Sequence, residues 1–239
     1  GLAGYIDPPQ EDVEESIRTC REAGVHVVMV TGDHPETARN IAGRVAIVDN
    51  EDAPVFTGKD VDGYDDKNDA EKREFSDARI FARVDPGQKL SILKRFQESG
   101  EIAGMTGDGV NDTPALKKAD IGIAMGRRGT QAAKEVADMI LKNDDFPSIV
   151  TAIRQGRIIF NNIRKFIIYQ LSYHLAEIIV IAAVSFSIFY LPLLPLQLLF
   201  LNLLTDVFPA LALGIGKGRG KVLQEMPKDP EEPILTKKS

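Results

Sequence analysis

The chain has 239 residues, a formal net charge of −6 and a hydrophobic content of 44%, which permits one large domain or two small ones. The negative net charge argues against nucleic acid as a partner, and we expect none. The single cysteine, Cys20, excludes an internal disulfide framework, and we expect its thiol to pack within a helix.

The first part of the chain alternates between helical and strand patterns. Short apolar runs bounded by turn residues are typical of parallel strands that are buried on both faces. Alternation with helices predicts an α/β fold with helices on both faces of a parallel sheet and ligands at the carboxyl ends of the strands. The acidic stretch from Asp49 to Ala78 is interpreted as a surface excursion. We predict helices over 11–23, 35–45, 86–99 and 114–119, and strands over 25–30, 80–84, 102–105 and 121–125.

The later part of the chain contains two apolar runs, from Phe166 to Leu191 and from Leu193 to Ile215. Each run exceeds the length of about 20 residues that a helix needs to cross a bilayer. An excess of Lys and Arg marks the cytoplasmic side, so we predict a transmembrane hairpin with both ends inside and the turn near Pro192 outside. The basic residues are Arg154, Arg157, Arg164 and Lys165 before the first run, and Lys217, Arg219 and Lys221 after the second.

The segment from Pro147 to Leu191 contains no further proline and only one glycine, Gly156. At 1.5 Å per residue, an uninterrupted helix of about 44 residues would span roughly 65 Å. We hypothesise that this stalk helix transmits movements of the soluble part to Glu177, inside the first apolar run.

A motif from Thr106 to Asp112 follows the strand predicted over 102–105. Gly107 and Gly109 let the backbone approach a ligand and are expected to take positive φ. Asp108 and Asp112 supply the hard anionic oxygens that Mg²⁺ prefers. The motif therefore predicts a magnesium and phosphate site; the alternative is an Asx turn before an N-capped helix.

Other polar groups follow strands or begin helices. Thr31 offers a hydroxyl and Gly32 a backbone amide at the end of a strand, where a phosphoryl oxygen can be held. Lys89 begins a helix and can place a point charge on a phosphate, and Asn111 offers an amide donor between the two aspartates. Each of these signals is weak alone, because Thr-Gly-Asp is a common turn and most lysines are solvated.

In this order the motifs resemble those of the P-type cation-transporting ATPases, in the calcium-pump branch. The resemblance covers nearly the whole chain. It implies a partial haloacid-dehalogenase-like Rossmannoid parallel sheet, a long stalk helix and a transmembrane α-helical hairpin, with Mg²⁺ and ATP as cofactors. The motifs are Asp7-Pro8-Pro9, Thr31-Gly32-Asp33, Phe81 to Pro86 with Lys89, Thr106 to Asp112, and Asn202 to Asp206.

The resemblance also implies roles for individual residues. Asp108 and Asp112 hold Mg²⁺, Thr31 and Lys89 contact an aspartyl phosphate, and Asn111 orients it. Gly32 belongs to the same catalytic set, and Asp7 and Asp33 to cofactor binding. Gln10 stands where the family usually has an arginine that contacts the nucleotide, so the chain departs from the family pattern at this contact.

In the apolar runs, the resemblance identifies the fifth and sixth transmembrane helices, with cation ligands at Glu177, Asn202, Thr205 and Asp206. Carboxylate, amide and hydroxyl oxygens suit Ca²⁺ and similar ions, and Pro209 frees backbone carbonyls nearby. His174 replaces an asparagine common in calcium pumps; it either tunes selectivity, carries a counter-transported proton or makes a polar packing contact. The alternative for Glu177 and Asp206 is a neutral acid bonded within the helix bundle.

We therefore expect a phosphorylation domain over 1–146, a stalk over 147–165, two transmembrane helices over 166–215 and a cytoplasmic tail over 216–239. The expected protein is a multi-pass membrane pump with its soluble domain in the cytoplasm. Its expected partners are a transported cation, Ca²⁺ first with Mn²⁺ and Na⁺ left open, the lipid bilayer and the remaining segments of the pump.

No Asp-Lys-Thr-Gly motif, whose aspartate takes the γ-phosphate of ATP in this family, occurs in these residues. We therefore expect a piece of a longer protein that is inactive by itself. Two alternatives stay open. One is a haloacid-dehalogenase-type phosphatase, for which Asp7 is the early nucleophile candidate. The other is a nonenzymatic regulatory membrane subunit.

Overall fold

The computed structural model describes residues 12–50, 52–188, 194–218, 220–229 and 232–234. The chain divides into two compact units, Gly1–Thr151 and Ala152–Ser239.

The strands of the first unit form two three-stranded sheets, and every described strand pair is parallel. The α/β prediction with parallel strands is therefore confirmed, although the strands divide between two sheets. The first sheet has the order β1-β3-β2, with β1 at Met29–Val30, β2 at Phe56–Thr57 and β3 at Ile80–Ala82. The second has the order β4-β5-β6, with β4 at Gly104–Gly107, β5 at Ile121–Met125 and β6 at Met139–Leu141.

Helices follow most of these strands, and local capping signals fix where several of them begin. Asp85 caps the helix after β3 by accepting the backbone N–H of Gln88 at 2.8 Å, and Pro86 occupies the first turn.

Cys20 is only 2% exposed, and burial raises the pKa of its thiol, as expected of a packing residue. The helices are α1 (Val13–Glu22), α2 (Pro35–Arg44), α3 (Gly58–Asp62), α4 (Asp69–Asp77), α5 (Pro86–Glu98), α6 (Thr113–Lys118) and α7 (Gln131–Val136), with short 3₁₀ turns η1 (Tyr64–Asp66) and η2 (Val110–Asp112).

The interpretation of residues 49–78 as a surface excursion is wrong. This segment supplies β2, α3 and α4, and Phe75 of α4 is 1% exposed. Its ring packs against the rings of Tyr64, Phe81 and Phe56, with centroid separations of 4.9, 5.0 and 5.5 Å. A helix needs only one apolar stripe to join a core. The many acidic residues of this segment therefore concealed the few apolar residues that are buried.

Other differences concern element ends. The strand predicted over 25–30 is limited to β1, and β4 begins two residues later than the predicted start at Ile102. Both α7 and β6 were not predicted, and each has six residues or fewer. Such short elements carry too few residues to show a period in the sequence.

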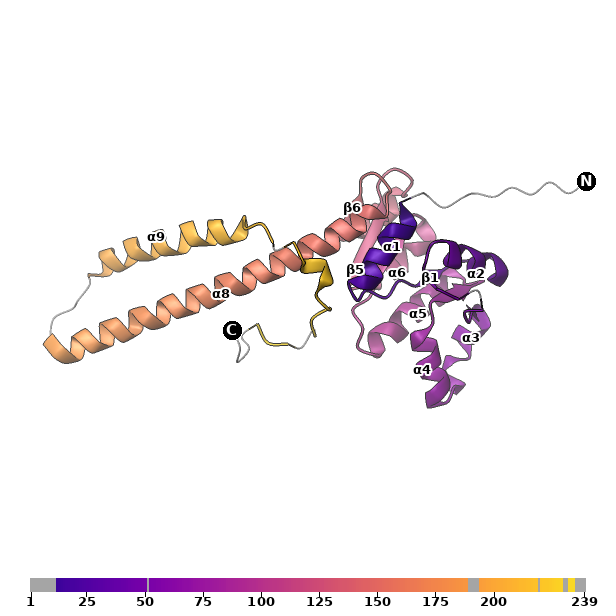
Figure 1. The fold of residues 1–239 in the computed structure, drawn as a ribbon, viewed down its shortest axis with the longest axis horizontal. Helices are drawn as coiled ribbons and strands as arrows, with labels where there is room; N and C mark the ends of the chain where they lie inside the picture. The colour runs from indigo at the N-terminus through magenta and orange to yellow at the C-terminus, as the bar shows by residue number, and fades with distance from the viewer. Residues whose placement is uncertain (1–11, 51, 189–193, 219, 230–231, 235–239) are drawn as a thin grey trace, which may run out of the picture. The chain divides into compact units, whose positions relative to one another are not determined.

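The second unit contains most of α8 (Pro147–Ile188), a continuous helix of 42 residues, and all of α9 (Pro195–Gly214), which has 20 (Figure 1). The predicted uninterrupted helix is confirmed as far as Ile188. Both helices are long and apolar enough to cross a membrane by length and composition. The predicted turn near Pro192 lies outside the described residues.

Hydrogen bonds between α8 and α9 show that the two helices form an antiparallel hairpin. The side-chain amide of Asn162 on α8 donates to the carbonyl of Gly216, two residues after the end of α9, at 2.9 Å. Further along α8, the hydroxyl of Tyr169 donates to the carbonyl of Thr205 at 3.3 Å. Partners on α9 thus move backward along the chain as those on α8 move forward.

The segment after α9 packs along α8. Val222, in the short 3₁₀ turn η3 (Val222–Gln224), is 2% exposed. The guanidinium of Arg157 donates to the carbonyls of Val222 at 3.1 Å and Glu225 at 2.6 Å. The ammonium of Lys228 donates to the side-chain oxygen of Asn161 at 2.7 Å.

Candidate functional site

The loop after β1 carries Thr31, Gly32 and Asp33, and it is joined to the end of β3. The backbone N–H of Thr31 donates to the carbonyl of Phe81 at 2.9 Å, and that of Val84 donates to the carbonyl of Thr31 at 3.1 Å. The Thr31 hydroxyl donates to a carboxylate oxygen of Asp33 at 2.9 Å. Gly32 and Asp33 are exposed. These three residues therefore form a fixed turn at the carboxyl end of two neighbouring strands.

An ion pair between Lys89 and Asp112 lies at the centre of the candidate site. The Lys89 ammonium, in the first turns of α5, donates to Oδ1 of Asp112 at 2.7 Å, and the two side chains are only 21% and 10% exposed. The other carboxylate oxygen accepts the backbone N–H of Gly109 at 3.3 Å. With both carboxylate oxygens engaged, the buried side chain of Asp112 keeps one orientation.

Gly107 and Gly109 do not take the positive φ that the sequence predicted. Gly109 has a φ of −100°, and the described glycines with positive φ are Gly24 and Gly100. Gly107 is needed for a different reason, because a Cβ atom there would lie 2.6 Å from Cβ of Asp112. The missing side chain at Gly107 therefore makes room for the buried aspartate.

The loops after β4, β5 and β6 are joined to one another at the carboxyl edge of the second sheet. The carbonyl of Asp108 accepts the backbone N–H of Thr130 at 2.8 Å. The carboxylate of Asp144 accepts the backbone N–H groups of Arg127 at 2.9 Å and Arg128 at 2.7 Å. No motif in the sequence points to Asp144, because its side chain acts on a loop 16 to 17 residues away.

The structure brings the predicted residues together in part. Lys89 contacts Asp112 directly, and Asp108 and Asn111 are exposed in the same loop as Asp112. Thr31 bonds to Asp33, and Asp7 lies outside the described residues.

The donor set at this edge fits Mg²⁺. Among the described residues, no group of three or more His, Cys, Asp or Glu is arranged to hold a metal ion. Mg²⁺ commonly uses only one or two carboxylates, with water and phosphate oxygens in its other positions. The exposed carboxylate of Asp108 and the buried one of Asp112 supply this number from one loop.

A second polar cluster joins α8 and α9 in the second unit. The side-chain nitrogen of Gln170 lies 2.6 Å from Oδ1 of Asp206 and 2.9 Å from Nε2 of His174. Nδ1 of His174 lies 3.4 Å from a carboxylate oxygen of Glu177. The predicted ion-site residues Glu177, His174 and Asp206 are thus connected through Gln170, which sequence analysis missed. Its spacing of four residues from His174 and seven from Glu177, on one helical face, is the signal that could have found it.

The other two predicted ion ligands lie on α9. The hydroxyl of Thr205 donates to the carbonyl of Leu201 at 2.8 Å. The side-chain oxygen of Asn202 is buried and accepts no hydrogen bond from the described residues. A buried oxygen without a donor is a free ligand position for a cation.

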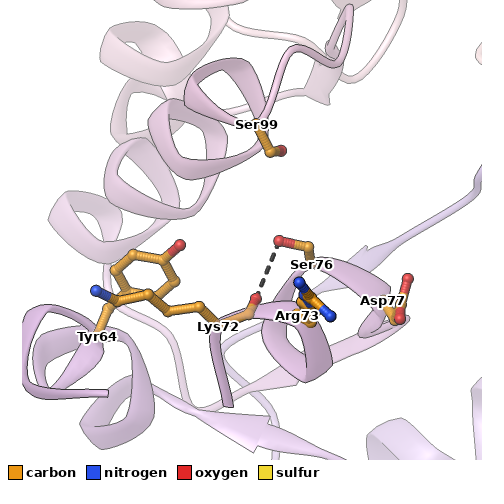
Figure 2. Close-up of a pocket in the computed structure, with 6 residues that line it drawn as sticks. All are labelled: Tyr64, Lys72, Arg73, Ser76, Asp77 and Ser99. Carbon is orange, nitrogen blue, oxygen red and sulfur yellow. Dashed lines mark hydrogen bonds between the residues drawn. The ribbon is translucent and has the colours of Figure 1, made fainter. Parts of the chain in front are cut away.

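An open pocket of about 360 Å³ lies between α4 and the C-terminal end of α5 (Figure 2). The ring of Tyr64 on one side of it packs against Lys72, and Ser76 donates to the carbonyl of Lys72 at 3.1 Å. Ser99 follows α5, whereas Lys89 is ten residues earlier, about 15 Å along the helix at 1.5 Å per residue. The pocket is therefore separate from the Lys89–Asp112 pair. It is lined by Tyr64, Lys72, Arg73, Ser76, Asp77 and Ser99.

The carboxylate of Asp144 predicts a pH dependence of stability. Burial raises the pKa of Asp144. The hydrogen bonds from the backbone N–H groups of Arg127 and Arg128 lower it by more than burial raises it, so the net pKa lies below its ordinary value. A depressed folded-state pKa stabilises the fold above the unfolded value of about 4, and this contribution is lost as pH falls through the folded pKa. We expect Asp144→Asn to lower the melting temperature at pH about 7 and to lower it much less at pH about 3.

Thermal unfolding of the detergent-solubilised chain, followed by circular dichroism, checks this expectation. Asp66→Asn is the matched control, because Asp66 is exposed, and we expect it to leave the melting temperature unchanged. A difference between wild type and Asp144→Asn that stays constant from neutral to acid pH would contradict the assignment.

Known family models match both the earlier and the later part of the chain. The family model described as haloacid dehalogenase-like hydrolase matches residues 1–120, and a second model with this description matches residues 89–153. The model described as "Cation transporting ATPase, C-terminus" matches residues 190–239. A solved structure of the catalytic domain of the CPx-ATPase CopB-B aligns with 60% of this chain and 45% of its own, at 21% identity and a TM-score of 0.43.

Curated relatives align over nearly all of the chain. A calcium-transporting ATPase of Bacillus subtilis is 45% identical over 100% of the chain, and calcium-transporting ATPase 1 of Bacillus cereus is 42% identical over 99%. The cation-transporting ATPase pma1 of Synechocystis is 41% identical over 100%. The chain spans 26% of the length of each of these relatives. With half of its residues matched by the family model and its later residues by the cation ATPase model, the chain belongs to the haloacid dehalogenase-like hydrolases, in the branch of the P-type cation-transporting ATPases.

Proposed function

We propose that these residues serve an ATP-driven cation pump, which carries Ca²⁺ across a membrane through an aspartyl-phosphate intermediate. The observation that carries the proposal is the Lys89–Asp112 pair, which lies beside the exposed Asp108 at the carboxyl end of β4. The relatives named calcium-transporting ATPases support Ca²⁺ as the cargo.

In this proposal the first unit stabilises a phosphoryl group. Asp108 and Asp112 would hold Mg²⁺, which supplies positive charge to the phosphate oxygens when bound. Lys89 orients the Asp112 carboxylate through their hydrogen bond, and its ammonium adds positive charge to the same site. Thr31 and the amide of Gly32 bind phosphate oxygens, Asn111 orients the phosphate, and Asp7 and Asp33 act in cofactor binding. The aspartate that accepts the phosphoryl group belongs to a motif absent from these residues.

The second unit contributes to the path of the cation. Glu177, Asn202, Thr205 and Asp206 offer hard oxygen ligands, and His174 lies between the two carboxylates in the hydrogen-bonded chain. Polar groups of this kind in apolar helices are typical of ion pathways. We place α8 and α9 across the bilayer and the first unit on the cytoplasmic side, because Lys and Arg flank the outer ends of both helices.

The helix α8 is the proposed link between hydrolysis and ion binding. Its first residues, from Pro147, belong to the first unit, and Glu177 lies further along the same uninterrupted helix. A helix without a break passes a tilt or a shift of one end to the other more directly than a jointed one.

Asp108→Asn tests the magnesium assignment. In the full-length protein that carries these residues, we expect this change to abolish formation of the phosphoenzyme from ATP, because it removes an anionic ligand while the exposed position tolerates the amide. Acid-stable labelling with radioactive ATP measures the phosphoenzyme. Asp77→Asn, at another exposed aspartate, is the control that should keep wild-type labelling. A wild-type level of phosphoenzyme in the Asp108→Asn variant at ordinary Mg²⁺ concentrations would contradict the magnesium assignment.

Asp206→Asn and Glu177→Gln test the ion site in the same full-length protein. Both changes remove a carboxylate oxygen charge from the α8–α9 cluster and leave the first unit unchanged. We therefore expect loss of the Ca²⁺-activated phosphorylation by ATP, with phosphorylation by inorganic phosphate retained. Unchanged Ca²⁺ dependence in both variants would show that these carboxylates are structural acids.

A further inference from the structure

We propose that Gln170 is a positioning residue of the cation site, which holds the Asp206 carboxylate in place and connects it to His174 and Glu177. This inference rests on the proposed function and adds a residue that the family motifs of the sequence do not contain. Gln170 lies on α8, whereas Asp206 lies on α9, 36 residues later in the chain.

The hydrogen bonds of Gln170 fix its orientation. Its side-chain nitrogen carries two hydrogens and has two partners, Oδ1 of Asp206 at 2.6 Å and Nε2 of His174 at 2.9 Å. The opposite amide orientation would place the Gln170 oxygen against the Asp206 carboxylate, which is repulsive. The nitrogen therefore faces both partners, as assigned from the hydrogen-bond network.

This orientation determines the state of His174. Because Gln170 donates to Nε2, that ring nitrogen is the acceptor, and in the neutral ring the proton lies on Nδ1. Nδ1 faces a carboxylate oxygen of Glu177 at 3.4 Å. One N–H of Gln170 thus points toward the Asp206 carboxylate and the other toward Nε2 of His174, while Nδ1–H of His174 faces the Glu177 carboxylate.

Two oxygen atoms of the cluster have no donor in the part of the chain that the structure describes. They are the side-chain oxygens of Gln170 and Asn202, and both are buried. Gln170 contacts Asp206, and Asn202 lies one helical turn before Asp206 on α9. A buried amide oxygen without a partner costs free energy, which a bound cation would recover.

Replacement of Gln170 would therefore act on the ion site through Asp206. Leucine at this position has no donor, so the Asp206 carboxylate would lose its partner from α8 and gain rotational freedom. Glutamate keeps the length and one oxygen but replaces the donor nitrogen with an acceptor. Loss of this anchor weakens a site whose affinity depends on converging oxygens, and it changes the discrimination between ions of different size.

The test measures the Ca²⁺ and Mn²⁺ concentrations that give half-maximal phosphorylation by ATP in the full-length protein. We expect Gln170→Leu and Gln170→Glu to raise the half-maximal Ca²⁺ concentration about tenfold, the effect of losing one hydrogen bond to a charged group. We also expect the ratio of the Ca²⁺ and Mn²⁺ values to change, which a purely structural defect would leave constant. Phosphorylation by inorganic phosphate should stay at the wild-type level.

Gln155→Leu is the matched control, because Gln155 is an exposed glutamine on the same helix. Its half-maximal Ca²⁺ concentration should equal that of wild type. Loss of phosphorylation by inorganic phosphate in Gln170→Leu would indicate a folding defect in that variant. The half-maximal Ca²⁺ and Mn²⁺ concentrations of Gln170→Glu, whose side chain has nearly the same volume as the native one, then test the proposal.

Two results would overturn the proposal, and they differ in what else they remove. A wild-type half-maximal Ca²⁺ concentration in both Gln170 variants, with Ca²⁺ activation lost in Asp206→Asn, removes the role of Gln170 and leaves the proposed function intact. Wild-type Ca²⁺ activation in the Gln170 variants and in Asp206→Asn removes both.

Discussion

The arrangement of the candidate phosphate site depends on one ion pair, between Lys89 and Asp112. A carboxylate that is this little exposed needs a partner, because an unpaired buried charge costs several kcal/mol, on the order of 3–5 when one partner is removed. Lys89 comes from the helix after β3, in the first sheet, and Asp112 from the loop after β4, in the second. The pair therefore joins elements of the two sheets. The room left by Gly107 and the N–H of Gly109 complete the environment of Asp112.

Hydrogen bonds to backbone groups hold the remaining loops at this edge, and they leave the carboxylate of Asp108 available to bind a ligand. Thr130 bonds to the carbonyl of Asp108, and Asp144 holds the amides of Arg127 and Arg128. The carboxylate of Asp108 is exposed on this framework. A fixed backbone with exposed oxygen ligands is the preorganisation that electrostatic catalysis requires. In the hairpin of α8 and α9, a hydrogen bond between Gln170 and Asp206 likewise fixes a carboxylate. Exposed apolar residues of the same helices include Phe186, at 90%, and Leu196, at 77%.

Features with a local cause could be predicted from the sequence. The start of α5 follows from Asp85 and Pro86, and the long uninterrupted α8 follows from the lack of an internal proline. Features that depend on distant partners could not. Phe75 is buried by rings from other elements, Asp144 acts on a loop across the sheet edge, and Gln170 meets Asp206 across 36 residues. The motif from Thr106 to Asp112 predicted a positive φ at Gly107, whereas the structure shows that this glycine makes steric room for Asp112, which is a tertiary property.

Phosphorylation of Lys89→Gln by inorganic phosphate tests the central role of this ion pair most directly. The reaction, in the full-length protein at saturating Mg²⁺ and without Ca²⁺, reports on the phosphate site alone. Lys94→Gln, at an exposed lysine on the same helix, is the matched control. We predict loss of the phosphoenzyme in Lys89→Gln and wild-type levels in Lys94→Gln. Equal, wild-type levels in both variants would contradict it.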